Sequence, residues 1–207
     1  MALADRVERV SLIIVDSLGY GEYLSHKHLL PHLSSMETQG LFFRCLVYSH
    51  STTPSIATIL CGLKPEHHRI TKTEEAYTST LKCLPEVAHQ HGFRVAVVME
   101  KHGALSFHGR ADTIKPVADR PDVVSFDEEV CRNAVSVIED FDPNLLVAHF
   151  RSLDKLGFNP ETVRHLGSTL DKLFRPTRKD TLVLVCGDHP PHSRTDERHV
   201  ALIAFKT

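Results

Sequence analysis

Side chains that could bind a metal ion follow several apolar runs of this sequence. Asp16 follows VSLIIV, Asp154 comes shortly after LLVAHF, and Asp188 and His189 come shortly after TLVLVC. Thr52 stands in a loop just before the apolar segment SIATIL. Carboxylates and imidazoles bind divalent cations, and a hydroxyl at a helix N-terminus is well placed to attack a bound phosphoryl group. These residue types together predict a metal site that handles a phosphoester.

The apolar runs alternate with helical patterns along most of the chain, and this alternation predicts the fold. Strands that read as continuous apolar runs between helices indicate a mainly parallel sheet covered on both faces, an α/β three-layer sandwich. The predicted strands are Val10–Asp16, Leu41–Tyr48, Phe93–Met99, Asp122–Phe126, Leu145–Phe150, Thr181–Cys186 and His199–Phe205. The predicted helices are His32–Thr38, a short one opened by Pro54 with Thr53 as N-cap, Leu81–His91, Asp127–Phe141 and Pro160–Phe174, with Lys101–Arg120 expected to be loop.

The predicted sheet would bring the candidate residues to one place. In open α/β sheets, ligands bind outside the carboxyl ends of the strands. Asp16, Asp154 and Asp188 each come just after a predicted strand, so three carboxylates would share one edge. Carboxylates this close repel one another unless cations neutralise them. The arrangement therefore predicts a metal centre beside Thr52.

At this combination the sequence resembles the alkaline phosphatase superfamily, in the branch of type I phosphodiesterases, nucleotide pyrophosphatases and metal-dependent phosphomutases. The likeness covers about Val10 to Phe205 and is most specific in Ser51–Ile70, which is similar to the family's nucleophile segment. By that pattern Thr52 resembles the nucleophile. The positions that also fit are Pro54, Thr58, Gly62, Pro65 and His68, whereas Arg69 replaces the family's usual glycine. The resemblance implies an alkaline-phosphatase-like core, here without room for a cap domain.

The resemblance also implies two divalent ions, usually zinc and sometimes manganese or magnesium. The ligands implied for one ion are Asp16, Thr52, Asp188 and His189. Asp154 resembles the first ligand of the other, whose pattern is Asp-x-x-x-His followed by a late histidine. Phe158 stands where the first of these histidines belongs. The late histidine is His192, with His199 as the fallback.

Loss of one imidazole leaves the second ion with a poorly filled shell. Three outcomes stay open: another histidine supplies the nitrogen, the second site is weak, or only one ion binds. The histidines that could replace the missing one are His165, His102 and His108.

The expected activity is metal-dependent hydrolysis of phosphomonoesters or phosphodiesters through a phosphothreonine intermediate formed on Thr52. The expected partner is a small phosphoester, and the candidate phosphate contacts are Lys101, His102 and Arg151. The alternative is a degenerate superfamily member that acts as a binding or regulatory module, which Phe158 and Arg69 favour. An unrelated nucleotide-binding domain is weaker, because DSLGYG is neither a Walker loop nor a GxGxxG fingerprint.

Composition narrows the class of protein further. The chain has 207 residues, the size of one domain, so we expect residues 1–207 to form a single one. With 24 Lys and Arg against 26 Asp and Glu, it offers no general attraction to nucleic acid or anionic lipid. No apolar run is long enough to cross a bilayer, and the start MALADRVERV lacks a signal-peptide core. Five cysteines without CxxC spacing predict neither a disulfide framework nor a zinc ribbon, which favours a cytoplasmic location.

Overall fold

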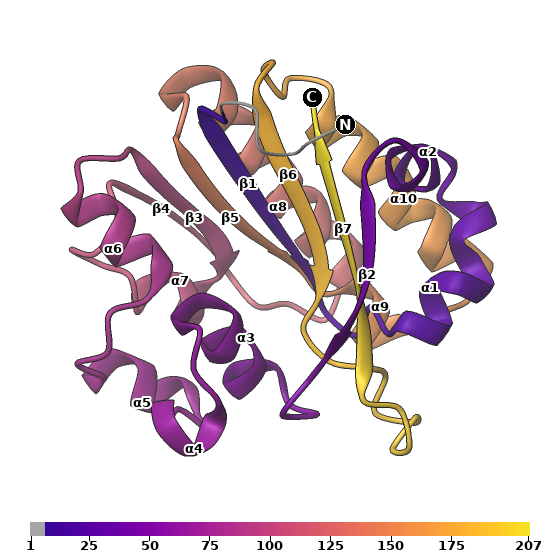
Figure 1. Ribbon diagram of the computed structural model, residues 1–207, viewed down its shortest axis with the longest axis horizontal. Coiled ribbons are helices and arrows are strands. Elements are labelled where there is room, and N and C mark those ends of the chain that lie inside the picture. The colour runs from indigo at the N-terminus through magenta and orange to yellow at the C-terminus, as the bar shows by residue number, and fades with distance from the viewer. Residues whose placement is uncertain (1–6) are drawn as a thin grey trace.

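The computed structural model describes residues 7–207 and is built around a seven-stranded sheet with the order β2-β7-β6-β1-β5-β3-β4 (Figure 1). β7 runs antiparallel to both of its neighbours, and the other strand pairs are parallel. The predicted α/β sandwich with a mainly parallel sheet is therefore confirmed. The strands are β1 (Arg9–Val15), β2 (Leu41–Leu46), β3 (Val95–Glu100), β4 (Thr113–Val117), β5 (Leu145–Phe150), β6 (Thr181–Gly187) and β7 (His199–Lys206).

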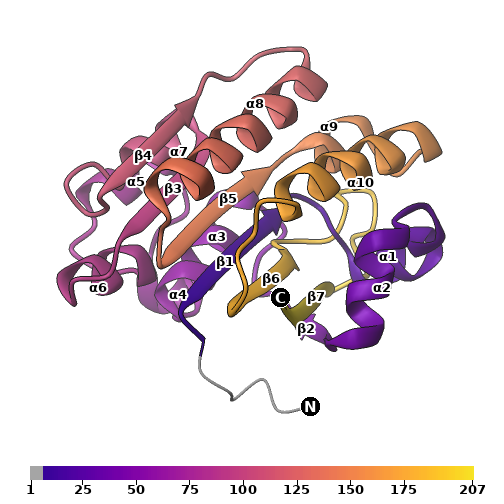
Figure 2. The same cartoon turned by 90° about the horizontal axis from the view of Figure 1, so that it is seen from above.

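Helices lie on both faces of the sheet, with α8, α9 and α10 on one side and α3, α4 and α6 on the other (Figure 2). A separate apolar cluster fills each side, because alternate residues of the central strands point to opposite faces: Ile13 and Val15 of β1 belong to one cluster, Leu12 and Ile14 to the other. The helices are α1 (Tyr20–His26), a 3-10 turn (Lys27–Leu29), α2 (Pro31–Gln39), α3 (Thr52–Cys61), α4 (Pro65–His68), α5 (Thr73–Thr78), α6 (Leu84–Gln90), α7 (Lys101–Leu105), α8 (Val123–Ser136) with a π turn (Val137–Phe141), α9 (Ser152–Leu156) and α10 (Pro160–Phe174).

Two predicted segments on the β3–β4 side of the sheet were wrong. Asp122–Phe126 is not a strand but the start of α8, where an Asp122 carboxylate oxygen accepts a hydrogen bond from the Ser125 backbone N–H. Lys101–Arg120 is not loop, since it contains α7 and β4. β4 is an edge strand that carries Lys115 and Pro116, so it lacks the apolar run that marks a central strand.

The helix that carries Thr52 begins earlier than predicted. α3 starts at Thr52 itself, and Ser51, not Thr53, is the N-cap. The helix ends at Cys61 and is followed by the C-cap Gly62, whose φ of 68° lies in the left-handed region that glycine favours. Thr52 therefore sits in the first turn of a ten-residue helix.

The cysteine arrangement differs from the sequence expectation, because Cys61 and Cys83 form a disulfide. Cys61 ends α3 and Cys83 precedes α6, so the bond closes a loop that contains α4 and α5. The two partners are 22 residues apart, and spacing alone does not reveal such a pair. The cysteine argument for a reducing compartment no longer applies, and the cytoplasmic location stays a prediction.

Within residues 7–207 no helix is long and apolar enough to cross a membrane. The expectation about a signal peptide falls partly on residues 1–6, which lie outside the described part of the chain. The single-domain assignment for residues 1–207 also stays a prediction.

We expect the double substitution Cys61→Ser and Cys83→Ser to lower the free energy of unfolding by about 3 kcal/mol, because the unfolded chain regains the entropy of an open 22-residue loop. Denaturant titration of both proteins under oxidising conditions measures the difference. The half-buried free thiol Cys45, changed to serine, is the control. Equal stability of the double variant and the parent would contradict the prediction.

Candidate active site

The predicted carboxylates meet at the carboxyl ends of three neighbouring strands, β6, β1 and β5. Asp16 follows β1, Asp188 follows β6, and Asp154 lies in α9 just after β5. Asp16 and Asp188 are buried, and only 4% of the Asp154 side chain is exposed. The strand order thus brings Asp16 together with two acids that lie 138 and 172 positions later in the sequence.

Thr52 faces the same edge from the first turn of α3. Its Oγ1 lies 3.2 Å from Nε2 of His189, and His189 Nε2 lies 3.1 Å from Oδ1 of Asp16. The Ser51 N-cap makes no side-chain hydrogen bond to the helix. The Thr52 hydroxyl therefore contacts the His189 imidazole, which in turn contacts the Asp16 carboxylate, at the centre of the site.

An inner group of three buried side chains, Asp16, His149 and Asp188, offers ligand atoms within 4.8 Å of one another. The atoms Asp16 Oδ1, His149 Nε2 and Asp188 Oδ2 are all buried; His149 Nε2 and Asp188 Oδ2 have no hydrogen-bond partner among the described residues, and Asp16 Oδ1 pairs with His189 Nε2 at 3.1 Å. Buried polar atoms rarely remain unpaired, so two of them beside the Asp16 carboxylate fit a cation bound between them. His149 was missed by the sequence analysis, although an imidazole inside the apolar run LLVAHF was the available signal.

The pKa values in the inner group reflect its burial and its close charges. Burial and the neighbouring Asp16 carboxylate raise the pKa of Asp188 well above its usual value. Burial lowers the pKa of His149 to about 4, so this imidazole is neutral at physiological pH. For His189, burial lowers the pKa, but the hydrogen bond to Asp16 and the charge of Asp188 outweigh it and raise the pKa to about 9. Without a metal ion the site therefore holds protons that a bound cation would replace.

Backbone groups fix the position of Asp188. Its Oδ1 accepts hydrogen bonds from the N–H groups of Ser17, at 3.0 Å, and His189, at 2.8 Å. Ser17 has a φ of 65°, in the left-handed region. Gly187 is required beside it, since a Cβ there would lie 2.3 Å from the carbonyl oxygen of Leu18. The turn after β1 and the end of β6 thus pack too closely for any other residue.

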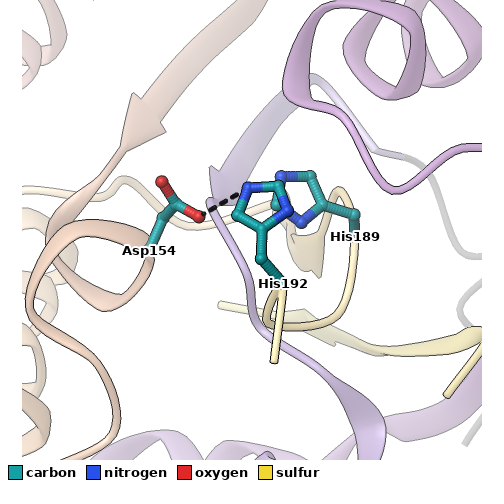
Figure 3. A group of neighbouring side chains, drawn as sticks. All are labelled: Asp154, His189 and His192. Atoms are coloured by element: carbon teal, nitrogen blue, oxygen red, sulfur yellow. Dashed lines mark ion pairs between the residues drawn. The ribbon is translucent and has the colours of Figure 1, made fainter. Parts of the chain in front are cut away.

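A second, outer group consists of Asp154, His189 and His192 (Figure 3). Nε2 of His192 lies 3.3 Å from Oδ1 of Asp154, and the His192 side chain is 60% exposed. Lys155 Nζ lies 2.8 Å from the other oxygen, Oδ2 of Asp154. The outer group therefore already includes a cationic side chain.

The residue at the position of the missing histidine lies away from the outer group. The ring of Phe158 packs 5.5 Å from the ring of His26 and against the apolar core. No other histidine takes its place: of the residues that the structure describes, neither candidate metal group contains His165, His102, His108 or His199. His199 instead lies 3.0 Å from Arg44 and 3.1 Å from Glu197.

The buried acid Asp127 of α8 holds the backbone that leads from β5 to Asp154. Asp127 of α8 accepts hydrogen bonds from the backbone N–H groups of Arg151, at 2.7 Å, and Ser152, at 3.0 Å. Burial raises the pKa of Asp127, partly offset by these bonds. The sequence analysis did not identify Asp127, because an acid within a helical pattern carries no signal for a distant contact.

Of the three candidate phosphate contacts, Lys101, His102 and Arg151, two lie beside the site. Arg151 and His102 line a cavity together with Thr52, and Lys101 is not among the lining residues. The Arg151 guanidinium lies 3.0 Å from Asp119 and over the ring of Phe126. Of the three, Arg151 is thus the candidate held in place next to Thr52.

The family model described as Sulfatase matches residues 9–152, which is more than half of the chain. The protein belongs to the sulfatase family and, through it and its structural neighbours, to the alkaline phosphatase superfamily. No curated protein sequence matches the chain.

Solved structures with the same fold include a phosphonoacetate hydrolase from Sinorhizobium meliloti 1021 (TM-score 0.68, 16% identity, 89% of this chain and 56% of that chain). A protein in the alkaline phosphatase superfamily from Vibrio parahaemolyticus has a TM-score of 0.75 at 14% identity, over 98% of this chain and 60% of that one. The C-terminal periplasmic domain of EptC from Escherichia coli, in complex with Zn, has a TM-score of 0.71 at 9% identity, over 99% and 74%. The chain thus spans little more than half the length of the first two.

We expect Asp188→Asn to separate the folding role of this residue from its role toward a cation. The amide oxygen can still accept from Ser17 and His189, and the repulsion with Asp16 disappears. Without added metal, the melting temperature should therefore stay equal or rise. The stabilisation on adding a divalent cation, about 2.7 kcal/mol at a hundredfold excess over Kd, should be lost.

Thermal unfolding with EDTA and with zinc measures both quantities. Asp196→Asn is the control, since this acid is 87% exposed, and it should keep the cation-induced rise. An unchanged cation effect in Asp188→Asn would place the ion elsewhere.

Proposed function

We propose that this protein is a metal-dependent hydrolase of phosphate or sulfate esters that uses Thr52 as its nucleophile. The observation that carries the proposal is the group of three buried potential ligands, Asp16, His149 and Asp188, which lies beside the Thr52 hydroxyl and includes two ligand atoms without a hydrogen-bond partner among the described residues. The sulfatase family supports hydrolysis at a sulfate group, and the phosphonoacetate hydrolase among the structural neighbours shows that the same fold also acts on a phosphorus oxyanion. The phosphoester substrate expected from the sequence is one of the two classes.

The residues that would hold a divalent ion are Asp16, His149, Asp188 and His189, with Thr52 adjoining. Such an ion, bound there, lowers the pKa of a neighbouring hydroxyl and draws charge from the ester oxygens. Nitrogen and carboxylate ligands together suit zinc, and carboxylates alone suit magnesium or manganese. We propose zinc because two imidazoles border the group.

His189 orients the nucleophile. Its Nδ1 lies 2.8 Å from the carbonyl oxygen of Pro190, and a proton on Nδ1 is donated there. Its Nε2 lies 3.2 Å from Thr52 Oγ1; in the metal-free site, where the pKa of His189 is raised to about 9, Nε2 carries a proton, and a bound divalent ion would take the place of that proton beside Thr52. Thr52 attacks the phosphorus or sulfur atom, the bond to the leaving alcohol breaks, and water then cleaves the threonine ester. Arg151, which lines the same cavity, is placed to contact the oxyanion.

We propose further that a single divalent ion is enough. In the outer group Phe158 has removed one ligand, and the Lys155 ammonium already offsets the charge of Asp154. The alternative, a binding module with eroded metal chemistry, draws on the same Phe158. It predicts neither turnover nor metal stimulation with 4-nitrophenyl phosphate, bis(4-nitrophenyl) phosphate or 4-nitrophenyl sulfate.

We expect Thr52→Ala to reduce kcat on the best of these esters at least about a thousandfold, because the attacking oxygen is absent. Thr52→Ser should retain part of the activity. Thr38→Ala is the control, since the exposed Thr38 hydroxyl of α2 donates to the carbonyl oxygen of Ser34 and lies outside the site, and it should stay within a few-fold of the parent. Full activity in Thr52→Ala would move the nucleophile elsewhere.

We expect one ion per chain in the parent protein and tighter binding of a second ion in Lys155→Ala. The substitution removes a cation that lies 2.8 Å from Asp154 and frees an oxygen as a ligand. Elemental analysis after dialysis against dilute zinc gives the ion count, and Lys155→Arg, which keeps the charge, is the control. Two tightly bound ions in the parent would refute a single-ion centre.

A further inference from the structure

A cavity of about 690 Å³ opens beside Thr52, and most of it extends beyond Thr52 and Arg151, the two lining residues that the proposed chemistry uses. Its walls come from α3, from α5, and from the segment at the end of β3 that contains α7. Thr52, His149 and Arg151 line it, so it is continuous with the candidate active site. Cavities of this size accommodate drug-sized organic molecules.

The inner surface of the cavity is mainly apolar. Ile56 and Leu60 contribute from α3, and Met99 and Phe107 contribute from the β3 side. Leu60, Met99 and Phe107 belong to the buried apolar cluster on this face of the sheet. A ring system placed here would contact aliphatic, aromatic and thioether groups, which favours an aromatic ligand over a saccharide.

The acidic side chains that line the cavity outnumber the arginines. Glu100 accepts hydrogen bonds from the N–H groups of His102 and Gly103, and Asp119 pairs with Arg151. Arg110 donates to the carbonyl oxygen of Ser79. With Glu74 the lining has three acids and two arginines, so a second anionic group on a ligand would meet repulsion.

The walls of the cavity are tied to one another. The Tyr77 hydroxyl of α5 donates to the carbonyl oxygen of His102 in α7, at 2.7 Å. Thr53 of α3 and Thr73 of α5 are in hydroxyl contact. The disulfide between Cys61 and Cys83 closes the segment that carries α5 onto the end of α3. The cavity is thus formed before a ligand binds, which limits the ordering cost of binding.

We propose that this cavity binds the alcohol part of the substrate and that this part is an uncharged fused-ring aryl alcohol. The inference rests on the proposed function and names its substrate class. The phosphate or sulfate group would lie at Thr52 with the ring system in the cavity. As the Thr52 oxygen forms its bond to phosphorus or sulfur, the bond to the aryl oxygen breaks and the aryl alcohol leaves with a proton.

Binding of 2-naphthol to the full chain tests the cavity separately from the chemistry. The sequence has no tryptophan, so naphthol fluorescence can be followed with little protein background. Ile56→Glu places a carboxylate in the apolar lining, and we expect it to weaken binding at least tenfold. Ile59→Glu is the matched control: the same change on the same helix, at a residue that lines a separate groove with Leu184 and Leu202.

Ala76→Glu, on the opposite wall, repeats the test if Ile56→Glu does not fold, and thermal unfolding checks each variant. We expect the anionic probe 2-naphthol-6-sulfonate to bind at least tenfold more weakly than 2-naphthol. Equal or tighter binding of the sulfonate overturns the assignment of an uncharged ligand. Absence of saturable naphthol binding, or equal loss in Ile56→Glu and Ile59→Glu, overturns the assignment of the cavity.

Hydrolysis of 2-naphthyl phosphate and 2-naphthyl sulfate, measured beside methyl phosphate, distinguishes the two proposals. Ile56→Glu should raise KM for the naphthyl ester at least tenfold, whereas the control Ile59→Glu should leave kcat/KM for the naphthyl ester and for methyl phosphate unchanged. Naphthol binding without turnover of any ester rejects the hydrolase and supports the cavity assignment. Turnover of methyl phosphate without naphthol binding rejects only the cavity assignment.

Discussion

Electrostatic repulsion between Asp16 and Asp188 is the constraint on which the site depends. Both carboxylates are buried; Asp188 Oδ2 has no hydrogen bond among the described residues, and Asp16 Oδ1 pairs with His189. Two such groups cannot both be ionised in a dry environment without a compensating cation, and the raised pKa of Asp188 expresses this cost. The protein tolerates this loss of folding free energy because the packed central strands β6, β1 and β5 hold the two carboxylates in place. An arrangement costly for stability yet fixed by the backbone is typical of a site built for ligand binding.

The strand order explains why the polar residues meet, and two local details explain why they meet so closely. β1 lies between β6 and β5, so Asp16 is central and its neighbours come from both sides. Ser17 in the left-handed region and Gly187 without a side chain allow the turn after β1 to touch the end of β6. The Ser17 backbone N–H donates a hydrogen bond to Asp188, and the Ser17 hydroxyl donates one to Asp154 at 2.9 Å. One residue therefore links the inner and outer groups.

Most of the fold and the position of Asp16, Thr52 and Asp188 followed from the sequence, because buried strands read as apolar runs and strand exits share an edge. What failed depended on contacts distant in sequence. His149 was assigned correctly to a strand, but its position beside Asp16 and Asp188 could not be read from the apolar run around it. The disulfide joins two cysteines whose spacing gives no signal. DVVSF satisfied strand composition but serves as a helix start, since Val123 and Phe126 lie on the buried side of α8. Periodicity over five residues cannot separate these cases.

The inner and outer groups differ in a way that orders their affinities for cations. The inner group is buried, and His149 Nε2 and Asp188 Oδ2 have no hydrogen-bond partner among the described residues, so an ion there would interact with two carboxylates and would have to displace only the proton between His189 and Asp16. The outer group has an exposed imidazole, a carboxylate already paired with Lys155, and His189 shared with the inner group. An ion there must displace an ammonium and compete for one imidazole. If the Lys155 ammonium takes the place of a second ion, as proposed, it compensates the charge of Asp154 but supplies no Lewis acid, and activation of water would then depend on the residues around His189 and His192.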